Sequence, residues 1–156
     1  MPTKLRLGVL AAASAMFTTT AVAAAPVAEG GRKFTTSLTG AAECNSSGTC
    51  NLGDPDGSGT AKIYVNYGQN RVCWDISVSN IDAPTRAHIH RGPATGSGGI
   101  VVSFFETAET ADLESCTTAS LDPDLVKNLI QNPQEYYVNV HNAAFPGGAV
   151  RGQLSK

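Results

Sequence analysis

Charged side chains are scarce in this sequence: Lys, Arg, Asp and Glu together make up 15% of its 156 residues. No cluster of Lys and Arg occurs after the first six residues, which argues against nucleic acid and anionic membrane surfaces as partners. Beyond residue 23 no apolar run is long enough to cross a bilayer, so we expect no membrane span. The sequence also lacks a GxSxG elbow and an ordered Ser–His–Asp pattern, and with them the usual features of a serine hydrolase.

The N-terminus has the pattern of an export signal. Lys4 and Arg6 precede a stretch of apolar or small residues over 7–22, and "AVA" at residues 21–23 fits a small-residue cleavage site. We therefore predict a signal peptide over 1–23, a flexible leader over 24–33 and one domain over 34–154, in a secreted or periplasmic protein. Without Lys4 and Arg6, nine basic side chains face thirteen acidic ones, so the exported chain has a net charge of −4.

All four cysteines follow the predicted signal peptide, and none of them forms a CxxC pair of the kind that binds zinc. An even number of cysteines in an exported chain favours two disulfides, for which the sequence allows three pairings. We favour Cys44–Cys50, which would close the short loop "CNSSGTC", together with Cys73–Cys116, which would tie a strand to a distant segment.

Short alternating runs separated by turn residues dominate the chain from residue 34 onward, as is typical of an all-β domain. In the clearest run, Val72, Trp74 and Ile76 alternate with polar or small residues. Strands are expected in the runs 33–40, 60–67, 70–81, 85–90, 100–105, 136–141 and 149–154. The second and third of these runs are joined by "YGQN" and are predicted to form a hairpin.

One short helix interrupts the strands. Asp122 fits an N-cap, Pro123 fits the first helical position, and "NP" at residues 132–133 ends the pattern. The helix carries an apolar stripe: Leu125, Val126, Leu129 and Ile130. Strands before and after a single helix predict a mostly antiparallel β-sandwich of two sheets, with the helix as the crossover between them.

Several segments, in this order, resemble the chordin-type (CHRD) domain: "SLTGAAE", "GSGTAKIYV", "AHIHRGPA", "GGIVVSF" and "YYVNVHNAAFPGGAVRGQL". The resemblance covers residues 34–154. It implies an immunoglobulin-like or Cu,Zn superoxide dismutase-like antiparallel β-sandwich in an exported protein, but it implies no defined molecular function. The segment "AECNSSGTC" departs from the family pattern and looks like an insertion closed by a disulfide.

The chain has three histidines, and two of them, His88 and His90, lie one residue apart in "AHIHRG". Because side chains alternate along a strand, these two share a face, and Tyr137, Asn139 and His141 share a face on their own strand. If the two faces coincide, the three imidazoles converge and could hold copper or zinc. A dismutase-type copper site uses four histidines, one more than this chain has.

The same histidines have a structural interpretation. An imidazole can donate from one ring nitrogen and accept at the other, so these rings could hold the strands and the long flexible turn over residues 91–99. Arg91 and Arg151 could join such a network. Glu106 and Glu109 lie in a polar segment and are expected to be solvated.

Three functions are therefore considered, in this order. The first is a non-enzymatic extracytoplasmic module that binds a protein partner or has a structural role. The second is a copper- or zinc-binding protein with His88, His90 and His141 as ligands. The third, a copper-dependent redox enzyme, is the least favoured because the chain offers only three imidazoles.

Overall fold

The computed structural model describes residues 30–108 and 111–156, so the predicted signal peptide over 1–23 and Glu109 lie outside the described residues. The strands follow one another along the chain as β1 (Arg32–Thr39), β2 (Ser58–Asn66), β3 (Arg71–Ser79), β4 (Arg86–Arg91), β5 (Gly99–Phe105), β6 (Glu114–Cys116), β7 (Tyr136–His141) and β8 (Val150–Gln153). The helical elements of the described part are α1 (Pro123–Gln131) and the 3-10 turns η1 (Gly40–Ala42) and η3 (Pro133–Glu135).

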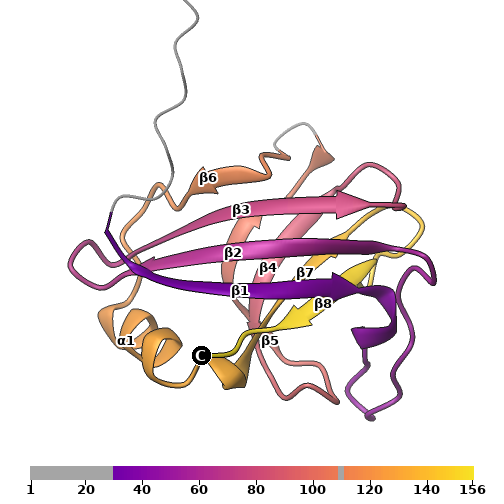
Figure 1. The fold of residues 1–156 in the computed structure, drawn as a ribbon, viewed down its shortest axis with the longest axis horizontal. Coiled ribbons are helices and arrows are strands. Elements are labelled where there is room, and N and C mark those ends of the chain that lie inside the picture. The colour runs from indigo at the N-terminus through magenta and orange to yellow at the C-terminus, as the bar shows by residue number, and fades with distance from the viewer. Residues whose placement is uncertain (1–29, 109–110) are drawn as a thin grey trace, which may run out of the picture.

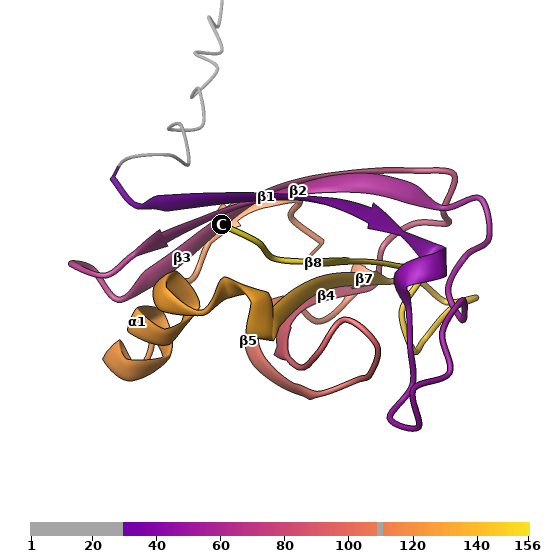
Figure 2. The ribbon, with the colours of Figure 1, turned by 60° about the horizontal axis from the view of Figure 1, so that its bottom comes forward.

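The strands form one antiparallel sheet in the order β5-β4-β7-β8-β1-β2-β3-β6. Figure 2 shows the sheet folded into two layers, with β1, β2 and β3 above β4, β5, β7 and β8. The layers are joined where β1 meets β8, and there Thr39 pairs with Arg151. The predicted all-β, antiparallel sandwich is confirmed, although its two layers belong to one continuous sheet. The finer dismutase-like assignment stays a prediction.

The predicted strands all form, with two differences at short elements. Strand β1 begins at Arg32, inside the predicted leader, because its backbone pairs with Val65 of β2. Strand β6 is only three residues long, and no alternating run marked it. It lies beside β3, where Cys73 pairs with Cys116 in the register and in a disulfide. The second favoured disulfide, Cys44–Cys50, is also present.

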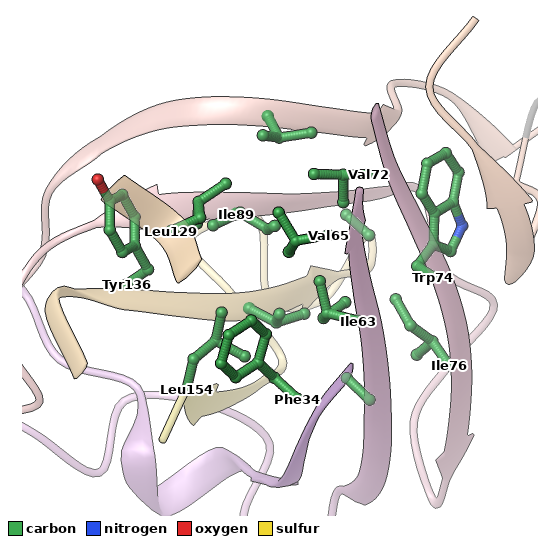
Figure 3. Close-up of a cluster of buried hydrophobic side chains, with 14 of the residues drawn as sticks. Phe34, Ile63, Val65, Val72, Trp74, Ile76, Ile89, Leu129, Tyr136 and Leu154 are labelled. Atoms are coloured by element: carbon green, nitrogen blue, oxygen red, sulfur yellow. The ribbon is translucent and has the colours of Figure 1, made fainter. Parts of the chain in front are cut away.

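The apolar core fills the space between the two layers, as Figure 3 shows. Phe34, Ile63 and Trp74 enter it from the upper layer, and Ile89 enters it from the lower one. Their alternation along the strands is the period-2 pattern of the sequence, and most residues of the predicted apolar faces are buried; Tyr67 and Ile100, at strand ends, are 53% exposed instead.

Helix α1 lies between β6 and β7 in the chain and so carries it from one edge of the sheet to the middle of the lower layer (Figure 1). The carboxylate of Asp122 accepts a hydrogen bond from the backbone N–H of Asp124, which confirms the predicted N-cap. Val126 and Leu129 are fully buried, so the apolar stripe packs into the core and the helix is a crossover.

The inner strands of the lower layer, β4 and β7, are buried on both faces. All six residues of β7 are buried, and so are four of the six residues of β4. Along both strands the apolar side chains face the core, and the alternate side chains, several of them polar, face away from it. Buried polar groups need partners, so this second face is where the chemistry of the molecule lies.

Candidate metal site

The three histidines converge on the outer face of the lower layer. One ring nitrogen from each of His88, His90 and His141 lies within 4.8 Å of the other two. These residues are 1%, 9% and 6% exposed, respectively, so the cluster is shielded from solvent. The predicted coincidence of the two strand faces is therefore observed, since β4 and β7 are neighbours and Arg86 of β4 pairs with His141.

Two of the rings are fixed by backbone carbonyls. The Nδ1–H of His90 donates to the carbonyl of Gly98, at 2.9 Å, and the Nδ1–H of His141 donates to the carbonyl of Pro146, at 3.1 Å. A neutral imidazole carries one proton, so these bonds place the proton of each ring on Nδ1. The Nε2 atom of each ring is then left with a free lone pair.

His88 is fixed by a carboxylate. Its Nε2 lies 3.3 Å from both carboxylate oxygens of Glu106, and Glu106 in turn accepts a hydrogen bond from Ser103. The pairing of β4 with β5 skips Phe104 and Val101, and these register shifts bring Ser103 opposite His88. The Nε2–H of His88 donates to the carboxylate, so the lone pair of this ring is on Nδ1.

The free lone pairs meet one another. The Nδ1 of His88 lies 3.1 Å from the Nε2 of His141, and the Nε2 of His90 is buried without a hydrogen-bond partner. Two lone pairs at this distance repel each other unless a proton or a metal cation lies between them. In metalloproteins, a ligating histidine usually donates its other N–H to a carboxylate or carbonyl, as all three rings do here.

Burial keeps the imidazoles neutral. It lowers the pKa of His141 to about 4, and the neighbouring His88 lowers it further than the Pro146 carbonyl raises it. Burial also lowers the pKa of His88 and of His90, although Glu106 and Gly98, respectively, act in the opposite direction. Neutral imidazole is the form that binds metal ions, so the site is ready for a cation at neutral pH.

A stack of flat side chains holds the site from β7 and β8. The ring of Tyr137 lies parallel to His90, with ring centroids 4.8 Å apart, and the guanidinium of Arg151 lies 3.4 Å from the centre of the same tyrosine ring. Arg151 donates to the carbonyls of Pro93 and Gly96, at 2.6 and 2.8 Å. These bonds, together with the one from His90 to Gly98, fix the turn over residues 91–99 beside the histidines. The turn was predicted to be flexible, whereas the structure holds it by hydrogen bonds.

A buried carboxyl group lies in the same polar layer. Glu43 follows η1 and is 5% exposed. Burial raises the pKa of Glu43 to about 7, while the charge of Arg151 and a hydrogen bond from Asn139 lower it. A side chain at Gly148 would collide with this carboxyl group, since an added Cβ would lie only 2.2 Å from its Oε1 atom. The carboxyl group is therefore packed tightly against the loop that precedes β8.

A comparison of the sequence with models of known domain families identifies the domain. The model of the CHRD domain matches residues 34–154, which is most of the chain. The chain belongs to the CHRD domain family. Comparisons with curated proteins and with solved structures found no match.

The two disulfides of this CHRD domain suit an oxidising compartment. Cys44–Cys50 closes a short loop in the connection between β1 and β2, and this loop extends below the strands in Figure 2. The Sγ of Cys44 lies 3.5 Å from the carbonyl oxygen of Ala94, so this loop contacts the turn that covers His90. Within the described residues no helix is long and apolar enough to cross a membrane.

Sequence reasoning found the three histidines of the CHRD domain but missed two of the groups around them. Glu106 was expected to be solvated; its side chain is 57% exposed, yet it also bonds His88. Glu43 carries no motif that could have singled it out. Of the two arginines expected in a histidine network, Arg151 joins it, whereas Arg91 pairs with Glu135 at the surface.

Proposed function

We propose that this CHRD domain is an exported, non-enzymatic binding module that holds one Cu(II) or Zn(II) ion. The ligands are the Nδ1 atom of His88 and the Nε2 atoms of His90 and His141. The observation that carries the proposal is that one ring nitrogen of each histidine converges with the other two, while the opposite nitrogen of each ring contacts an oxygen acceptor.

The spacing of the nitrogens supports an ion of this size. Two metal–nitrogen bonds of about 2.0–2.1 Å at a tetrahedral angle separate the nitrogens by about 3.3 Å. The contact of 3.1 Å between His88 and His141 is close to this value. The third nitrogen lies within 4.8 Å of both, so an inward shift of at most about 1.5 Å completes the site. Imidazole ligands suit both copper and zinc.

Burial of the ligands favours binding over catalysis. A catalytic metal keeps a position open to water or substrate, whereas rings that are 1–9% exposed leave little access from solvent. The positive N-terminus with its apolar stretch supports export, and the two disulfides support an oxidising destination, where Cu(II) and Zn(II) occur without thiol competitors.

The test is metal analysis of the exported protein, purified without chelators, followed by Zn(II) and Cu(II) titration by calorimetry. We expect about one ion per chain. The double variant His88→Gln/His141→Gln should lose this binding, while Arg91→Gln, an exposed change on the same strand, should keep it. If the wild-type protein binds no metal more tightly than the double variant does, the histidines are a purely structural network.

A further inference from the structure

A fourth acceptor atom lies among the three histidines. The Oδ1 atom of Asn139 is buried and has no hydrogen-bond partner, and the same is true of the Nε2 atom of His90. The whole Asn139 side chain is 2% exposed. An unpaired buried carbonyl oxygen destabilises the fold, so a residue placed in this way calls for a ligand.

The strand register places Asn139 at the centre of the site. It pairs directly with His88 across β4 and β7, and its neighbour Tyr137 pairs with His90. His141 follows two residues later on the same face of β7. The amide thus lies opposite one ligand, diagonal to the second and beside the third along the strand.

The amide is oriented by the carboxyl group behind it. A hydrogen bond links the Asn139 side chain to the carboxyl group of Glu43, and a carboxylate accepts from the NH2 group of an amide, not from its oxygen. The NH2 group of Asn139 is therefore directed to Glu43, and its oxygen is directed to the histidines. This oxygen and the Nε2 atom of His90 are both buried acceptors without a hydrogen-bond partner, on the same face of neighbouring strands.

We propose that the Oδ1 atom of Asn139 is the fourth protein ligand, which completes a closed N3O site, and that Glu43 positions its amide. This inference rests on the metal site proposed above and specifies its chemistry. Four protein ligands are typical of structural zinc sites, and an amide oxygen is a hard donor. The site should therefore favour Zn(II) and Cu(II) over Cu(I), and it should hold the ion without bound water.

The test compares three variants for Zn(II) affinity by calorimetry and for Cu(II) coordination by electron paramagnetic resonance. Asn139→Leu keeps the volume but removes the oxygen, and it should weaken Zn(II) binding at least about tenfold and change the Cu(II) spectrum. Asn139→Asp restores an oxygen donor and should bind more tightly than Asn139→Leu. Asn128→Leu is the matched control, because Asn128 bonds Tyr136 away from the site, and it should bind like the wild type.

A second measurement, on the wild-type protein, covers the case in which Asn139→Leu does not fold. Zn(II) should shift the side-chain carbonyl carbon resonance of Asn139 in NMR spectra, while the resonance of Asn128 should stay in place. If the wild type binds Zn(II) through its histidines but the Asn139 resonance and the Asn139→Leu affinity are unchanged, the fourth-ligand assignment is wrong and the three-histidine site stands. If the wild type binds no metal at all, the proposed function fails first.

Discussion

His88 and His141 face each other through ring nitrogens that are 3.1 Å apart, and the outer hydrogen bonds of the two neutral rings assign a lone pair to each of these nitrogens. The protons are elsewhere because Glu106 holds the Nε2–H of one ring and the carbonyl of Pro146 holds the Nδ1–H of the other. Two fixed acceptors at this distance form an electrostatically unfavourable contact in an apolar surrounding, and a cation turns it into a favourable one. The outer hydrogen bonds therefore prepare the inner contact for a metal ion.

The pH dependence of metal binding follows from the neutral state of the rings. Protons and metal ions compete for the same nitrogens, so a lowered pKa moves this competition to lower pH. Burial lowers the pKa of His141 to about 4, against 6.5 for an ordinary histidine. We expect the Zn(II) affinity to stay nearly constant from pH 7.5 down to about pH 5.5 and to fall below about pH 5, as measured by competition with a chromophoric chelator. A decline that starts near pH 6.5 would contradict this prediction.

Glu106 should act as a positioning residue for His88. Its carboxylate fixes the proton of that ring on Nε2, which leaves Nδ1 as the ligand atom. Glu106→Ala should reduce the Zn(II) affinity by about tenfold to a hundredfold. Because the side chain is 57% exposed, Tm of the metal-free protein should change little. Glu114→Ala, at the exposed edge strand, is the control and should alter neither quantity.

Alternation along the strands made most of the fold predictable. The period of two identified which residues of β3 and β4 face the core, and it placed His88 with His90 and Asn139 with His141. A pattern of this kind indicates a face, but it does not indicate what covers that face. The outer face of β7 is buried because loops far away in the sequence fold over it, and no local signal records such a contact.

The carboxyl groups of the site were unpredictable for the same reason. Glu106 reaches His88 only because β5 skips two residues in its pairing with β4, and Glu43 arrives from the connection between β1 and β2. Register shifts and the paths of connections depend on tertiary packing, whereas the sequence around either glutamate looks like an ordinary polar segment.

Arg151 should stabilise the fold far more than Arg91 does. It is fully buried and donates to the carbonyls of Pro93 and Gly96, bonds that a lysine cannot make together in the same planar geometry. Arg151→Lys should lower the free energy of unfolding by about 2–4 kcal/mol, measured by urea denaturation without metal. Arg91→Lys is the matched control. Arg91 and its partner Glu135 are both exposed, so solvent screens their ion pair and the loss should be much smaller than for Arg151. Equal losses would mean that Arg151 does not fix the turn.

The two disulfides should differ in what they stabilise. Cys73–Cys116 closes a loop with a sequence separation of 43 and holds the edge strand β6, so its removal by serine substitution should cost about 4 kcal/mol on loop-entropy grounds. Cys44–Cys50 spans a separation of 6 and should contribute about 2 kcal/mol. Its removal should also weaken Zn(II) binding, because the loop it closes contacts the turn that holds His90. Unfolding and calorimetry of both double-serine variants test this order, and the reverse order of stability losses would refute it.

Glu43 should make the metal-free protein less stable as the pH rises. Its pKa is raised from 4.5 to about 7 in the folded state, so between these values the folded protein holds a proton that the unfolded chain has released. The stabilising contribution of this proton is complete below pH 4.5 and is lost as the pH rises through 7. The shift corresponds to about 3 kcal/mol.

Glu43→Gln removes this titration while preserving the shape of the side chain. Between pH 5 and 8, the free energy of unfolding of the wild type should fall by about 2.5 kcal/mol relative to that of the variant. The comparison isolates Glu43 because the buried histidines and Arg151 are common to both proteins, and the histidines change stability in the opposite direction. Urea denaturation at a series of pH values measures the difference. If the free energies of unfolding of the two proteins change in parallel with pH, the pKa of Glu43 is not raised in the folded protein.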